Sequence, residues 1–69
     1  MYRYEMTIGG KLYTGEHATD PMDALDAAVI LYGNDHGLTR LAAMDRIDRL
    51  YGTTLKTKMY EDGVLIEET

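Results

Sequence analysis

Glycine-containing turns stand near both ends of the chain, and each separates two short segments with strand character. Gly9-Gly10 follows residues 2–8, in which apolar and polar side chains alternate, and Asp62-Gly63 joins residues 55–60 to residues 64–67. Both dipeptides are typical of two-residue hairpin turns because their positions tolerate positive φ angles. The sequence therefore predicts two β-hairpins, one at each end.

A two-residue turn at Gly9-Gly10 also predicts the register of the first hairpin. The apolar side chains then share one face, which we expect to be the core face: Tyr2, Tyr4, Met6, Ile8 and Tyr13. Arg3 and Glu16 meet on the opposite face, which we expect to be solvated.

The second hairpin has the same plan. With regular pairing across Asp62-Gly63, Met59 lies opposite Ile66, and the predicted core side carries Leu55, Met59, Val64 and Ile66. On the other side Tyr60 pairs with Leu65, and Lys58 pairs with Glu67.

Two helices are predicted between the hairpins. Asp20 and Pro21 suit the N-cap and the first helical position, and Gly33 is the expected left-handed stop. The second helix spans about residues 39–51 and closes at Gly52. Apolar residues share one face of each helix: Met22, Leu25, Ala28, Val29 and Tyr32 in the first, and Ala43, Met44, Ile47, Leu50 and Tyr51 in the second.

The element order ββααββ predicts an α+β fold, with an antiparallel four-stranded sheet and both helices packed on one face. We expect one compact domain covering residues 1–69. The order of the strands in the sheet stays open.

Residues for nucleophilic catalysis are scarce. The chain has no serine and no cysteine, and a lone threonine would need a base beside it. The carboxylate pairs Asp23–Asp26 and Asp45–Asp48 project from polar helix faces, where no pocket excludes water from them. We expect no enzymatic activity.

Ligand motifs are equally absent. His17 and His36 match no metal-binding spacing. Gly9-Gly10 is a turn between strands rather than a loop that opens a helix, and Gly33 and Gly37 lack the Lys and Ser/Thr of a phosphate-binding loop. We expect no metal and no cofactor.

Charge is the most informative functional feature of the sequence. The net charge is −5, and no Lys or Arg occurs between Lys11 and Arg40. The predicted partner-binding acidic surface consists of Glu16, Asp20, Asp23, Asp26, Asp35, Glu67 and Glu68. Nucleic-acid binding requires a cationic surface, so the expected partner is a basic or nucleic-acid-binding protein rather than nucleic acid itself.

No apolar run is long enough to span a membrane, and the N-terminus lacks the pattern of a signal peptide. The sequence therefore predicts no membrane partner and a cytoplasmic location.

In size, acidity and lack of catalytic residues, the chain resembles the small anti-defence proteins of phages and mobile elements, anti-CRISPR proteins among them. The resemblance rests on Glu16, Asp20, Asp23, Asp26, Asp35, Glu61, Asp62, Glu67 and Glu68. It implies an inhibitor that mimics nucleic acid and acts in the host cytoplasm, by presenting carboxylates to a basic groove.

Two other functions are compatible with the sequence. A homodimer or small assembly module could be joined through Ile30, or through Tyr60 and Leu65 on the outer sheet face. Whether Ile30 packs against the second helix or stays exposed is open. A ligand-binding or enzyme subunit could form its site between protomers, with His17 or His36 as the ionisable group.

Overall fold

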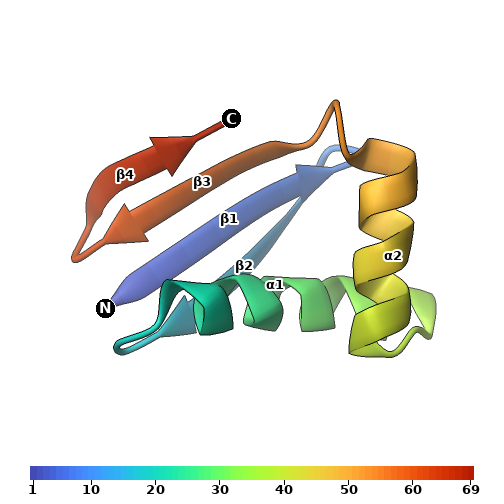
Figure 1. Cartoon of the computed structure of the whole chain (residues 1–69), viewed down its shortest axis with the longest axis horizontal. Coiled ribbons are helices and arrows are strands. Elements are labelled where there is room, and N and C mark those ends of the chain that lie inside the picture. Colours follow the sequence, from blue (N-terminus) through green and yellow to red (C-terminus); the bar gives the residue numbers. More distant parts are fainter.

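The computed structural model covers residues 1–69 and shows the predicted ββααββ order (Figure 1). The elements are β1 (Tyr2–Ile8), β2 (Lys11–His17), α1 (Pro21–His36), α2 (Arg40–Tyr51), β3 (Lys56–Glu61) and β4 (Val64–Glu68). The four strands form one antiparallel sheet in the order β2-β1-β3-β4. The first and third strands are therefore central, and each hairpin contributes one edge strand. The α+β prediction is confirmed.

The first hairpin has the predicted register. Met6 pairs with Tyr13 and Tyr4 pairs with Gly15. The turn residues Gly9 and Gly10 have φ angles of 58° and 79°, the left-handed conformation that a type I′ turn demands at both positions.

The second hairpin departs from the predicted register beyond its first two rungs. Tyr60 pairs with Leu65 as expected, but a β-bulge follows, and Met59 pairs with Glu67 instead of Ile66. The prediction that Lys58 pairs with Glu67 is wrong for the same reason, because the extra residue shifts every later pair by one position.

The first helix begins as predicted and ends one turn later. The Asp20 side chain accepts a hydrogen bond from the Met22 N–H at 2.8 Å. Gly33 is not the stop; the helix continues to His36 and ends at Gly37, whose φ of 67° is left-handed. A Cβ on Gly33 would lie 2.7 Å from the Leu38 carbonyl oxygen. Gly33 thus lets the Leu38 backbone pack closely against the helix, and it does not end the helix.

The hydrophobic core lies between the sheet and the two helices. Its ten buried residues are Tyr4, Met6, Ile8, Tyr13, Ala24, Ala28, Val29, Tyr32, Ala43 and Ile47. The first helix crosses β2 and β1, where a Cβ on Gly15 would lie 2.1 Å from the Ala24 carbonyl oxygen. The second helix packs mainly against α1 and stands across its C-terminal end (Figure 1).

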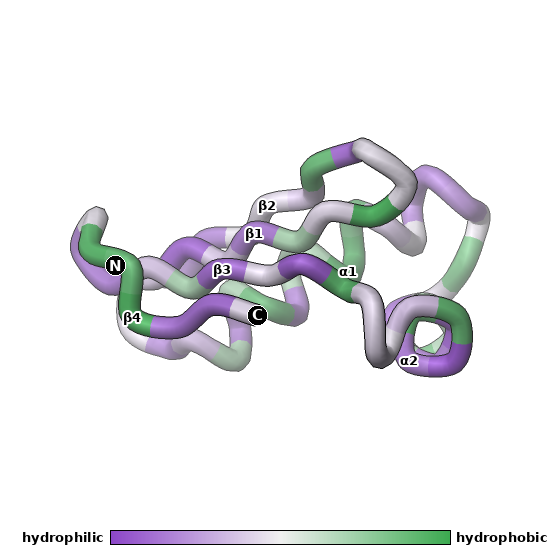
Figure 2. The backbone as a smooth tube through the Cα atoms, turned by 90° about the horizontal axis from the view of Figure 1, so that it is seen from above, coloured by the Kyte–Doolittle hydropathy of each residue, from purple (hydrophilic) through white to green (hydrophobic).

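Four residues predicted for the core are exposed. Val64 and Ile66 are exposed because no helix covers β4, and Met22 and Leu50 lie outside the helix–sheet contact. In Figure 2 the hydrophobic start of β4 is seen at the surface beside the N-terminus. The fold therefore leaves the helix-side face of one hairpin open.

Candidate protein-binding surface

Five acidic side chains gather at one end of the molecule, where β1 starts, β2 ends and β3 turns into β4. We call Glu16, Asp20, Asp23, Glu61 and Asp62 the acidic end. The strand register brings His17 and Glu61 to either side of Tyr2. The His17 Nδ1 accepts hydrogen bonds from the backbone of Thr19 and Asp20, which holds the start of α1 against the end of β2.

The acidic end is fixed by local contacts. The Tyr2 hydroxyl donates to Glu61 Oε2 at 2.7 Å, and the terminal amino group contacts Asp62. The His17 Nε2 lies 3.4 Å from an oxygen of Asp23. The hydrogen bond to Glu61, together with the charges of Glu61, Asp62 and Asp20, raises the pKa of the Tyr2 phenol. Glu61, Asp62 and Asp20 therefore lie close enough together to affect the same phenol.

Most of the net side-chain charge belongs to this end, where the terminal amino group also lies against Asp62. The acidic end holds five of the twelve Asp and Glu residues, whereas Arg3 is the one Lys or Arg beside them among seven in the chain. The rest of the molecule is close to neutral. The acidity of the sequence is thus a polarised charge distribution rather than a uniform one, and only the folded chain shows this.

Three residues of the predicted acidic surface lie elsewhere and are paired. Asp26 contacts Arg40 at 3.4 Å, Glu68 contacts Lys58 at 3.9 Å, and Asp35 contacts Lys11. The structure brings together Glu16, Asp20 and Asp23 from the predicted set. It adds Glu61 and Asp62, which are among the carboxylates that carry the resemblance but are not part of the predicted partner-binding surface.

Asp35 belongs to a cluster that ties the first hairpin to the end of α1. Its carboxylate accepts hydrogen bonds from Lys11 and from the Tyr13 hydroxyl, the latter at 2.9 Å. The Lys11 and Tyr13 hydrogen bonds hold the pKa of Asp35 below its ordinary value. The Asp35 hydrogen bond raises the pKa of Lys11, and burial followed by the same carboxylate raises that of Tyr13. This cluster is structural.

The helix-side face of β3 and β4 is the second notable surface. Met59 lies opposite the core residue Tyr4 on one side and opposite Glu67 on the other. Glu61 lies between Tyr2 and Val64 in the same way. Apolar and acidic side chains therefore alternate on this face.

The α1 side chains Leu25 and Met22 border that face. Ala24 and Ala27 stand over Gly15 of β2, and Leu25 and Met22 lie on the other flank of α1. Leu25 is half-buried against the core, and Met22 is exposed. We call this surface the open inner face, formed by Met22, Leu25, Met59, Glu61, Val64 and Glu67. It adjoins the acidic end through Glu61 and contains no Lys or Arg.

The two apolar features predicted as a dimer contact are both present and are separate. Ile30 is 44% exposed, which answers the open question about its packing, and Leu65 is 43% exposed. Tyr60 pairs with Leu65 on the outer sheet face, but the Arg3 guanidinium lies 4.6 Å from the Tyr60 ring centroid and covers part of it.

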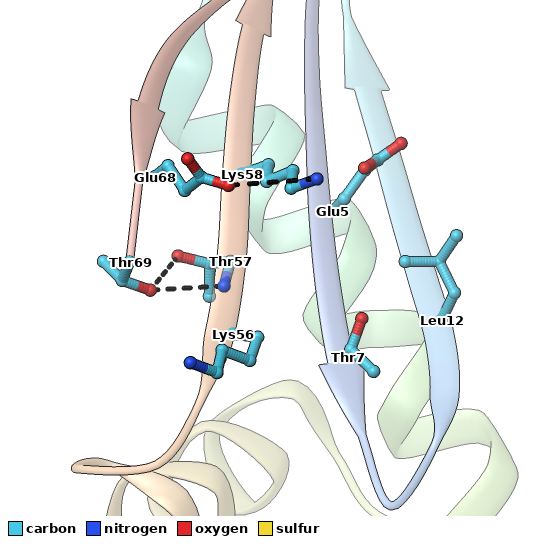
Figure 3. A pocket seen from close by; sticks show the side chains of 8 residues that line it. All are labelled: Glu5, Thr7, Leu12, Lys56, Thr57, Lys58, Glu68 and Thr69. Carbon is cyan, nitrogen blue, oxygen red and sulfur yellow. Dashed lines mark hydrogen bonds and ion pairs between the residues drawn. The ribbon is translucent and has the colours of Figure 1, made fainter.

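A shallow hollow of about 810 Å³ lies on the outer sheet face, with the helices behind the sheet (Figure 3). Its lining combines two Glu, two Lys, three Thr and a single apolar residue: Glu5, Glu68, Lys56, Lys58, Thr7, Thr57, Thr69 and Leu12. Small-molecule sites are concave and mostly apolar. The hollow is open and charge-balanced, so it favours no ligand class.

The ionisable groups show no preparation for acid–base chemistry. No charged side chain is buried, and no group of three His, Asp or Glu side chains is placed to hold a metal ion. The resolved pKa shifts raise Tyr2, Tyr4, Tyr13 and Lys11 and lower Asp35. Each shift strengthens the charge state that the group already has at neutral pH, whereas a general acid or base needs a pKa near the working pH.

Comparison of the chain with protein-family models, with curated proteins and with solved structures gives no match. Neither of the two helices has the length and apolar character needed to cross a bilayer. The function must therefore be argued from the fold and from the surfaces described above.

Proposed function

We propose that this protein is a non-enzymatic binding module whose acidic end engages a basic surface of a partner protein. The observation that supports this most directly is the concentration of the net charge at the acidic end, because a polarised charge steers association with an oppositely charged partner. No Asp, Glu, His, Lys or Arg side chain is buried, which supports binding rather than acid–base catalysis.

The partner class that fits is a nucleic-acid-binding protein. A groove that binds nucleic acid presents Lys and Arg to phosphates, and carboxylates on a rigid scaffold can occupy the same positions. Asp20 caps α1 and Asp23 stands on its first turn, and Glu16 and Glu61 stand on the sheet. Such an inhibitor would resemble the anti-defence proteins of phages in its mode of action.

Affinity capture with charge-reversed variants tests this function. The double variant Glu16→Lys/Glu61→Lys changes the acidic end, and Asp45→Lys/Asp48→Lys changes α2 by the same amount. Both variants move the net charge from −5 to −1, so only the location differs. Glu16 and Asp48 have no ion-pair partner, whereas Glu61 accepts the Tyr2 hydrogen bond and Asp45 pairs with Arg49. Each variant therefore loses one exposed contact, and circular dichroism checks that both fold.

We expect one basic partner to be retained at low salt by the wild-type protein and by the α2 variant, but not by the acidic-end variant. Raising the ionic strength should release the partner, because exposed charges are screened within about 10 Å at 0.1 M salt. Equal retention by both double variants, or retention that ignores salt, would contradict the proposed function.

A further inference from the structure

The sheet is wide enough for two helices side by side, and only one lies along it. Strands are spaced about 4.8 Å apart, and helices pack at about 10 Å, so a helix covers roughly two strands. The first helix covers β2 and β1, and α2 stands across the end of α1 instead of lying beside it (Figure 1). The inner side of β4 therefore has no helix packed on it, and Met59 of β3 is half-buried against the core.

From this vacancy we infer that the open inner face receives an amphipathic helix of the partner protein, with apolar side chains against Met59 and Val64 and basic side chains toward Glu61 and Glu67. The inference rests on the proposed function and specifies the surface and the kind of segment that is bound.

The side chains of the open inner face favour an amphipathic, basic helix. Val64 is 64% exposed and Met22 is 63% exposed, and burial of such side chains contributes about 25 cal/mol per Å² of apolar surface. Glu67 has no ion-pair partner in the protein. Lys58 lines the hollow on the outer face, and Lys56 lines both that hollow and a second one that includes the core residue Tyr4. An amphipathic helix with Lys or Arg beside its apolar stripe complements both the apolar and the acidic side chains of this surface.

A second copy of the chain fits poorly. Each copy carries a net charge of −5, and this charge opposes self-association. On α2 the exposed Leu50 stands beside Arg46 and Arg49, so α2 is the segment of a second copy that competes for this face, and self-association is an outcome of the test. The net charge nevertheless points to a different, basic chain.

The length of β3 sets the size of the helix. Six residues of strand extend about 20 Å, which equals about 13 residues of α-helix. A synthetic helical peptide of that length, with leucines at i, i+3, i+4 and i+7 and lysines at the flanking positions, is a suitable probe. The same peptide with glutamates in place of the lysines is its control.

Binding is measured by NMR titration of the full chain, and the test compares two variants of neighbouring residues. Val64→Lys changes the open inner face, and Leu65→Lys changes the outer face of the same strand. Both residues are exposed, so both variants should fold, which circular dichroism checks. A second inner-face variant, Glu67→Lys, removes charge without removing apolar surface.

We expect the lysine peptide to shift the amide signals of β3 and β4, and the glutamate peptide to leave them unchanged. Val64→Lys and Glu67→Lys should each weaken binding by about tenfold or more, and Leu65→Lys should leave it within about twofold of wild type.

Several results would overturn the inference. One is the absence of peptide binding; another is an equal loss of binding in Val64→Lys and Leu65→Lys. Self-association of the free protein that Val64→Lys abolishes would make a second copy the occupant. Binding of the basic peptide that is lost in Glu16→Lys/Glu61→Lys but kept in Val64→Lys would retain the proposed function and reject the helix site. Binding that is kept in the acidic-end variant would reject the proposed function.

Discussion

Gly15 is the residue whose missing side chain matters most for the fold. It lies in β2 directly beneath α1, and a Cβ there would stand 2.1 Å from the Ala24 carbonyl oxygen and 2.5 Å from the Ala28 backbone nitrogen. The obstacle is helix backbone, which cannot rotate away as a side chain can. The close approach of helix and sheet therefore depends on glycine at this position.

Gly15→Ala should consequently destabilise the protein by about 3 kcal/mol, the upper part of the usual range for overpacking. Urea unfolding followed by circular dichroism measures the loss. Thr14→Ala, one position earlier in the same strand, is the control and should cost far less. A Gly15→Ala variant as stable as wild type would show that α1 sits farther from the sheet than described.

Asp35 gives the protein a pH-dependent component of stability. Its hydrogen bonds from Lys11 and Tyr13 lower its pKa below the ordinary value of 3.8, so folding favours the ionised form. A lowered folded-state pKa contributes stability that is present above the unfolded-state pKa and is lost as pH falls through the folded-state pKa.

Asp35→Asn should therefore lower the melting temperature at pH 7, and the difference from wild type should shrink as the pH falls below about 4. Thermal unfolding at several pH values measures this. Asp48→Asn, which removes a carboxylate without an ion pair, should show no such convergence. A difference that stays constant down to pH 2 would contradict the role of the ionised Asp35 carboxylate.

At the scale of elements, the end of α1 shows where local signals compete. Both Gly33 and Gly37 follow apolar or helix-compatible residues and suit a C-cap. The choice depends on contacts distant in sequence: the Tyr32 ring stacks on His36 at a centroid distance of 4.2 Å, and Asp35 reaches Lys11 in the first hairpin. These contacts stabilise one further turn of helix.

Gly37→Ala should destabilise the protein by about 1 kcal/mol, because a residue with a Cβ is disfavoured at a φ of 67°. Gly37→Asn should cost less, since asparagine tolerates the left-handed region. The free energies of unfolding of the two variants test this order. An alanine variant more stable than the asparagine variant would argue against Gly37 as the cap.

The hairpin turns, the helix starts and the register of the first hairpin followed from the sequence because each is determined by neighbouring residues. The bulge at Ile66 and the open inner face did not. The bulge depends on how the last strand fits its neighbour, with Thr69 bonded to Thr57. The exposure of Val64 depends on which strands α1 covers, and periodicity along one strand carries no such information.

The same substitution at two valines tests the coverage of the sheet. Val29→Ala should cost about 2 kcal/mol because Val29 is 2% exposed. Val64→Ala should change stability by no more than about 0.5 kcal/mol because no helix covers it. Chemical denaturation of both variants measures the two losses of stability. A comparable loss for Val64→Ala would mean that β4 is covered in the free protein.

At the scale of the whole molecule, the acidic end lies across one end of the sheet, and it meets the uncovered second hairpin at Glu61. The helices cover the first hairpin, the second hairpin stays open on its inner face, and the acidic end adjoins that open part through Glu61. The acidic composition was visible in the sequence, but its concentration was not, because Glu16, Asp20 and Glu61 meet only once the sheet order is known.

Amide hydrogen exchange of the protein, free and bound to its retained basic partner, tests most directly whether this part of the molecule is the binding surface. The account predicts slower exchange in β3, β4 and the first turn of α1 on binding, with α2 and the β1–β2 turn unchanged. Protection confined to α2 or to the β1–β2 turn would contradict it.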